Sequence, residues 1–134
     1  MAVNYIAVLV AAIAHMVVGT LWYGPLFGKQ WMKLTGFTDK DIQKLKKEGM
    51  VKTMGLTFVS GIVTAYVLAY TIAYAQIQSA TLAMQVAFWL WLGFAAAVQL
   101  PNYLYECKPM KLYAITTGYT LVYLLVMAAI LAVW

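Results

Sequence analysis

The sequence predicts an all-α integral membrane protein: a bundle of four transmembrane helices with an amphipathic interfacial loop-helix between the first and second spans. Of the 134 residues, 65% are hydrophobic and only 10% are charged, a composition far from that of soluble globular chains. The apolar residues form four blocks, each near the ~20 residues that cross a bilayer. We therefore expect a single membrane domain over residues 1–134, with spans at about 3–24, 51–76, 81–104 and 112–134.

The first span carries the only histidine, His15. It lies about twelve residues into the span, and at 1.5 Å per residue that depth is ~18 Å, close to the midplane of a ~30 Å core. Ionisable residues at such depth usually face the bundle interior and often serve a function. Three interpretations stay open: a neutral imidazole bonded to a hydroxyl such as that of Ser60, Thr64 or Thr120, a proton or solute site, or metal or haem ligation. Without a second histidine a closed zinc site within one chain lacks ligands, and no metal is expected.

Residues 25–50 form the predicted interfacial segment. Pro25 ends or bends the first span, and residues 26–34 alternate apolar and polar groups as in a helix lying flat among headgroups. A second short helix is expected to begin at Thr38, with Asp41 in its first turn, and to stop at Gly49. The side chains expected at the interface or near headgroups are Trp22, Tyr23, Lys29, Trp31, Lys33, Lys44, Lys46, Lys47 and Lys52.

The charges predict an orientation in the cell (inner, cytoplasmic) membrane. All nine basic residues are lysines, and they lie with the four acidic residues in residues 25–52 and 105–111. Lysines in short loops stay on the cytoplasmic side and attract anionic headgroups. Both termini are therefore expected outside the cytoplasm, with 25–50 and 105–111 inside. The net charge of +5 indicates topology, and nucleic acid is not an expected partner.

Small residues recur every four positions in the first two spans. The first span has Ala7, Ala11 and Gly19, and the second has a longer series of Gly61, Ala65, Ala69 and Ala73. Residues four apart share one helix face, and small ones let another backbone approach closely, which is how membrane helices commonly pack. These faces predict an interface within the chain or between chains, as in a homo-oligomer or a complex with a partner membrane protein.

The third span contains two tryptophans near its middle and a polar, helix-breaking group near its end. Trp89 and Trp91 are expected to fill the core, or to stack on a planar ligand such as a quinone or porphyrin. Gln99 and Asn102 flank Pro101, and such a group either binds a solute in a broken helix or simply ends the span.

The run G-T-L-W-Y-G-P-L-F-G-K-Q-W-M-K-L-T-G from Gly19, W-L-G-F from Trp91, G-Y-T-L-V from Gly118 and the closing I-L-A-V-W resemble a small bacterial and archaeal membrane family. That family is catalogued only as a domain of unknown function, numbered seventeen-sixty-one. The resemblance covers essentially the whole chain and implies a compact integral membrane protein without an established activity. In the family pattern an amide commonly precedes the glycine of the last span and a histidine often follows the tyrosine. Thr117 and Thr120 occupy those places here.

The function expected first is that of a non-enzymatic membrane component that self-associates or packs with a partner through the small-residue faces. The alternative is an oligomeric small-solute or proton-linked transporter or channel, with His15 near the midplane. A third possibility is a membrane enzyme or a quinone- or haem-binding protein. The sequence shows no nucleophile–base pair and no phosphate-binding loop, so no catalytic residue and no cofactor are expected.

Overall fold

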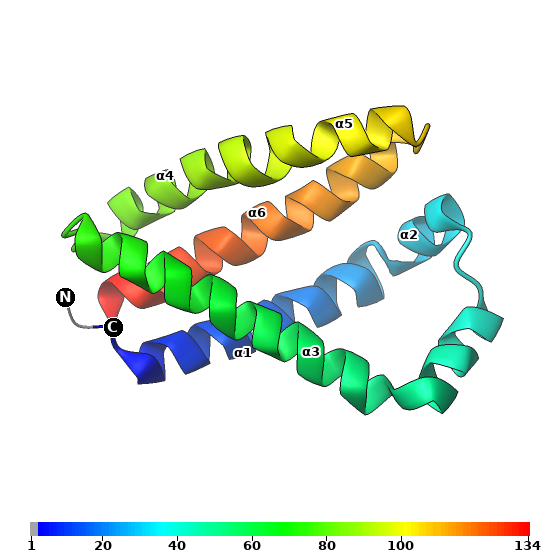
Figure 1. The fold of residues 1–134 in the computed structure, drawn as a ribbon, viewed down its shortest axis with the longest axis horizontal. Helices are drawn as coiled ribbons and strands as arrows, with labels where there is room; N and C mark the ends of the chain where they lie inside the picture. The colour runs from blue at the N-terminus through cyan, green and yellow to red at the C-terminus, as the bar shows by residue number, and fades with distance from the viewer. Residues whose placement is uncertain (1–2) are drawn as a thin grey trace.

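The computed structural model describes residues 3–134, and it is all-helical, as the sequence predicts (Figure 1). Four helical stretches are long and apolar enough to cross a membrane: Tyr5–Leu26, Asp39–Tyr74, Ala80–Tyr105 and Met110–Val133. The predicted fold class is confirmed, and the chain is a multi-pass membrane protein.

The first span consists of α1 (Tyr5–Leu21) and the π-helical turn η1 (Trp22–Leu26), followed by α2 (Gly28–Thr35). Pro25 lies inside η1. Because proline offers no amide hydrogen, it disrupts the regular hydrogen bonds, and here the helix widens into a π turn instead of stopping. Gly36 closes α2 with a φ of 74°, the left-handed conformation that glycine adopts most readily.

The next helix, α3 (Asp39–Tyr74), contains both the short helix predicted to begin at Thr38 and the second span. It begins in a reciprocal cap: the Thr38 amide donates to the Asp41 carboxylate at 2.8 Å, and the Asp41 amide donates to the Thr38 hydroxyl at 3.4 Å. Gly49 interrupts the helix with φ 118° and ψ 72°. The break therefore lies where the sequence places a stop, and the chain resumes as a helix directly after it.

The third span also contains a π turn. It consists of α4 (Ala80–Trp91), η2 (Leu92–Ala96) and α5 (Ala97–Tyr105), with Pro101 inside α5. The fourth span is the uninterrupted helix α6 (Met110–Val133). Both π turns therefore lie near a proline: Pro25 is inside η1, and Pro101 follows η2. Both of these spans run toward the end of the molecule that carries the lysines.

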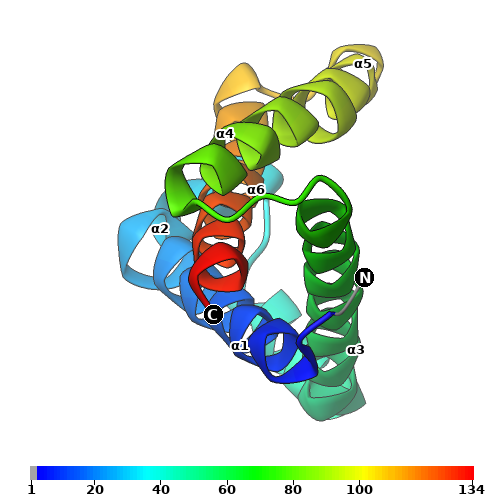
Figure 2. The same cartoon turned by 90° about the vertical axis from the view of Figure 1, so that its left-hand side faces the viewer.

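Helix α6 lies at the centre of the bundle and packs against α1, α3 and α4 (Figure 2). Alanines at these contacts let the helices approach closely. Among residues 3–134, the alanines with no exposed surface are Ala11, Ala12, Ala65, Ala83, Ala87 and Ala128, and Met127 is the largest fully buried side chain.

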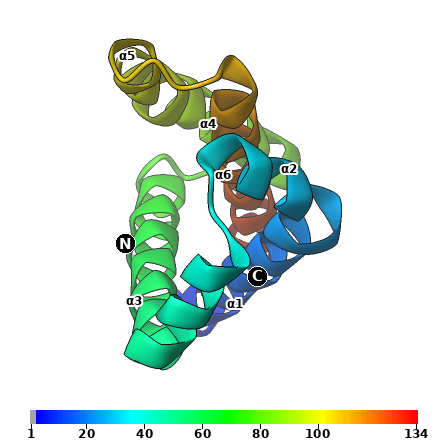
Figure 3. The same cartoon turned by 90° about the vertical axis from the view of Figure 1, so that its right-hand side faces the viewer.

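Helices α3 and α4 follow one another in sequence but hardly touch. From their shared turn they diverge toward the other end of the molecule, where α5 and the start of α3 stand well apart (Figures 1 and 3). The bundle is therefore open between the second and third spans.

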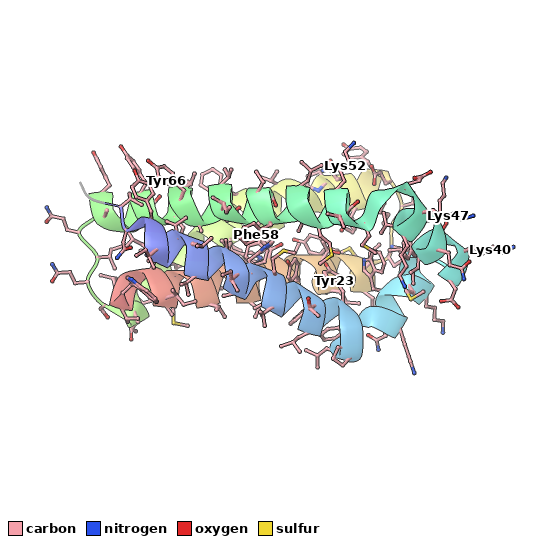
Figure 4. All side chains as sticks on the ribbon, turned by 90° about the horizontal axis from the view of Figure 1, so that it is seen from below. Tyr23, Lys40, Lys47, Lys52, Phe58 and Tyr66 are labelled. Atoms are coloured by element: carbon pink, nitrogen blue, oxygen red, sulfur yellow. The ribbon has the colours of Figure 1, made fainter. Side chains whose placement is uncertain are left out.

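The charged residues gather at that same end. Lys40, Lys47 and Lys52 lie at one end of the long axis and Tyr66 toward the other (Figure 4). The remaining lysines belong to α2, the first part of α3, the connection between α5 and α6 and the first turn of α6, so the formal charge of +5 falls on one end. The start of α1, the end of α6 and the uncharged turn between α3 and α4 lie at the opposite end (Figure 1).

Candidate functional site

His15 lies buried where α1, α3 and α6 meet, with 5% of its surface exposed. Its Nε2 is hydrogen-bonded to the Tyr119 hydroxyl at 3.0 Å. The edge of one ring meets the face of the other between His15 and Tyr123, whose centroids are 4.4 Å apart. Nδ1 has no hydrogen-bond partner. In either neutral tautomer, one ring nitrogen is therefore satisfied and the other is not.

Two glycines make room for this histidine–tyrosine pair. A Cβ at Gly61 would lie 2.8 Å from His15 Nδ1, and a Cβ at Gly19 would lie 3.0 Å from the Tyr119 hydroxyl. Real side chains keep a larger distance, so both positions accept only a hydrogen without displacement of the ring beside them. The two glycines therefore serve helix packing and also make room for the buried pair of His15 and Tyr119, which we call the polar centre.

An aromatic series leads from His15 toward the lysine end. Tyr119 lies 5.1 Å from Tyr23 between ring centroids, and Tyr23 lies 5.6 Å from Trp31. Trp31 in turn contacts Phe37 at 5.2 Å. These distances fall within the range of favourable aromatic pairs, so the polar centre and the interfacial helices form one packed unit.

Two tryptophans bind the backbone of α6 from different spans. The Trp22 indole donates to the carbonyl of Ile115 at 3.0 Å, and the Trp91 indole donates to the carbonyl of Thr117 at 2.8 Å. A helix carbonyl has a second lone pair free for such a bond. Trp22 is the first residue of η1, and Trp91 directly precedes η2. The first and third spans are therefore both hydrogen-bonded, beside their π turns, to backbone carbonyls of α6.

His15 is bonded to a hydroxyl, but this hydroxyl is that of Tyr119, so the prediction of Ser60, Thr64 or Thr120 as its partner is wrong. Ser60 and Thr64 lie on α3 and donate to carbonyls of their own helix at 2.7 and 2.9 Å. Thr120 likewise donates to Thr116 at 3.3 Å. Equal depth in the membrane does not bring two side chains together when helices cross, and the longer tyrosine reaches His15 instead.

The other members of the predicted intramembrane polar site lie elsewhere. Gln99 is partly exposed and Asn102 is exposed. Both belong to α5, which packs on α6 and has no contact of note with α1, the helix of His15. The six residues thus do not form one cluster.

The small-residue faces lie inside the chain. Ala7 and Ala11 are buried on α1, and Gly61, Ala65 and Ala69 are buried on α3, while Gly19 and Ala73 are partly buried. Helices α1 and α3 pack against each other, so these faces meet within one molecule. Sequence reasoning left this choice open.

Among the residues expected at the interface, the lysines and the aromatic residues differ in exposure. The lysines named above, at 29, 33, 44, 46, 47 and 52, are exposed, whereas Trp22, Tyr23 and Trp31 are partly buried and face the bundle. The exposed Lys108 pairs with Glu106 at 2.8 Å. This hydrogen bond is the main reason that the pKa of Lys108 lies above its ordinary value.

The outer face of α4 is uncovered. Trp89, expected in the core, is 66% exposed, and it lines a groove of about 600 Å³ with Thr81, Met84, Gln85 and Phe88. Further along, Gly93 and Ala97 are exposed as well, and a Cβ at Gly93 would meet open space. The glycine there is not required by packing within the chain.

The features missed from the sequence are Tyr119, Tyr123 and the bonding role of the tryptophans. The available signal was the spacing of two tyrosines four apart in the middle of the last span, on one helix face.

Within residues 3–134, no three His, Cys, Asp or Glu side chains come together as metal ligands.

These features define a polytopic helical membrane protein with a buried histidine–tyrosine pair at its centre and its charges at one end. The chain belongs to the family described as protein of unknown function, DUF1761, which matches residues 6–132. No curated protein and no solved structure matches the chain.

Proposed function

We propose that this protein is a non-enzymatic membrane component that associates in the bilayer with a second copy of itself, or with a partner membrane protein, through the outer face of α4 and α5. The observation that carries the proposal is that the third span packs on α6 alone and leaves this face bare. The faces of α1 and α3 are already used within the chain, so they are not available for association.

The chemistry of the bare face favours a protein neighbour over lipid. Gln85 is exposed on an apolar span, and an amide in hydrocarbon lacks hydrogen-bond partners. A second copy supplies the same amide across a two-fold axis, where residues of one patch meet their own counterparts. Gly93 and Ala97, which are exposed further along the same span, leave room for the two backbones to come close.

The test is the oligomeric state of the full chain in liposomes, measured by single-molecule photobleaching at increasing dilution in lipid. We expect dimers for the native protein and monomers for Gly93→Leu. Gly55→Leu is the matched control, because Gly55 is also exposed with open space around it, but lies on α3. A monomeric native protein, or dimers that survive both Gly93→Leu and Gln85→Leu, would refute self-association.

The orientation proposed for the molecule places the lysine end in the cytoplasm, because lysines in short loops are retained there. The single cysteine tests this directly, since Cys107 is exposed at the lysine end. In right-side-out vesicles a membrane-impermeant maleimide should label Cys107 only after the vesicles are opened. In the variant Cys107→Ser with Ser79→Cys, labelling should occur in sealed vesicles.

The second candidate function is a proton-linked or small-solute path through His15. Its supporting observation is the buried Nδ1 without a partner. Proteoliposome flux that is lost in His15→Leu but retained in Tyr66→Phe, an exposed position, would favour this function. Equal background flux for all three proteins would rule it out.

A further inference from the structure

A second cavity lies at the lysine end, separate from His15 and from the bare face of α4. It is partly open and has a volume of about 760 Å³, within the ~300–1,000 Å³ usual for small-molecule sites. It lies where α3 and α5 diverge, between the first part of α3, helix α2 and the start of α6. Its wall includes Tyr23, Trp31, Leu45, Thr57, Tyr103 and Lys108.

The lining is mostly apolar and includes a few hydroxyls and one charge. The aromatic and aliphatic side chains make most of the wall apolar, and hydroxyls come from Thr35, Thr53, Thr57 and Thr116. Lys108 contributes the only charged group to the lining, in the connection between α5 and α6. A molecule that fits this wall is apolar along most of its length and negative at one end.

The surroundings add a strong bias toward anions. All nine lysines and all four acids lie at this end, so the full +5 charge of the chain lies at the same end of the molecule as the cavity. Lysines at a membrane surface attract anionic lipids by roughly 1 kcal/mol each. The side between α3 and α5 faces the bilayer, because both are membrane-spanning helices that separate there (Figure 1).

We propose that this cavity binds one anionic phospholipid, with its phosphate beside Lys108 and an acyl chain along the apolar wall between α3 and α5. The Lys108 ammonium contacts Glu106 at 2.8 Å and lies over the Tyr103 ring at 5.5 Å from its centroid. Both partners of this ion pair are about half exposed. Exposed pairs are weak, so a phosphate replaces Glu106 readily.

The headgroup is tested by native mass spectrometry of the delipidated full chain in mild detergent, titrated with dioleoyl phosphatidylglycerol or dioleoyl phosphatidylcholine. We expect several-fold tighter binding of the anionic lipid, a loss of about fivefold in Lys108→Gln and a gain in Glu106→Gln. Lys111→Gln is the matched control, because it removes the same charge from an exposed lysine outside the cavity lining. Equal affinity for the two lipids, or equal losses in Lys108→Gln and Lys111→Gln, would overturn the proposal.

The acyl chain is tested by filling the cavity. Thr53→Trp places a large side chain at an exposed position of the lining, and Met54→Trp places the same side chain at its exposed neighbour outside the lining. Only Thr53→Trp should reduce phosphatidylglycerol binding, by tenfold or more. Displacement of the lipid by inorganic phosphate alone would show an anion site without a lipid chain, and equal binding by both tryptophan variants would place the lipid elsewhere. Either result contradicts the proposed site.

Discussion

Gly61→Ala tests the central contact of the bundle. The new Cβ would lie 2.8 Å from His15 Nδ1, while ordinary contacts begin near 3.4 Å, so the ring must move by about 0.6 Å. Tyr119 and Tyr123 hold the other sides of the ring. Overpacking of this kind costs about 1–3 kcal/mol, and loss of the hydrogen bond to Tyr119 adds about 1 kcal/mol. Against this, alanine favours a helix by up to ~1 kcal/mol over glycine.

The net expectation is a destabilisation of about 1–3 kcal/mol, measured by reversible unfolding in mixed micelles with rising sodium dodecyl sulfate. Gly55→Ala is the control, because its Cβ meets open space, and it should be neutral or slightly stabilising. In a His15→Ala background the clash is absent, so Gly61→Ala should no longer destabilise. The reasoning fails if Gly61→Ala costs as much without His15 as with it.

Three further predictions use the same unfolding measurement. Tyr119→Phe removes the partner of His15 Nε2 and should cost about 1–3 kcal/mol, since both ring nitrogens are then buried without a hydrogen bond; an unchanged midpoint would contradict the assigned bond. Trp91→Phe should cost about 1 kcal/mol for the lost bond to Thr117 plus lost packing, and a value indistinguishable from zero would argue against this link. Gly49→Ala should destabilise by about 1 kcal/mol or more, because its φ of 118° suits only glycine, and a stabilised variant would mean that the kink straightens.

Local structure could be predicted well from the sequence. The cap at Thr38 and Asp41 and the break at Gly49 depend on neighbouring residues only, and the structure has both. The four spans follow from hydropathy because a bilayer requires a minimum apolar length.

Side-chain partners between helices could not be predicted. The pairing of His15 with Tyr119 depends on where α1 and α6 cross, and neither periodicity nor depth sets that point. The exposure of Trp89 was missed for a related reason. A position near the middle of a span gives the depth of a side chain, but not whether that side of the helix faces the bundle, and Trp89 is 66% exposed.

The central place of α6 bears on how the molecule is assembled during synthesis. Helices α1 and α3 have each other as partners as soon as both are in the membrane, whereas α4 and α5 have α6 alone. Since α6 is translated after them, the third span is exposed to lipid until α6 is made. During that time Ala83 and Ala87, which are buried in the finished bundle, have no helix against them. A ribosome that stalls within the last span therefore leaves a half-built bundle, and only the final helix joins its two parts.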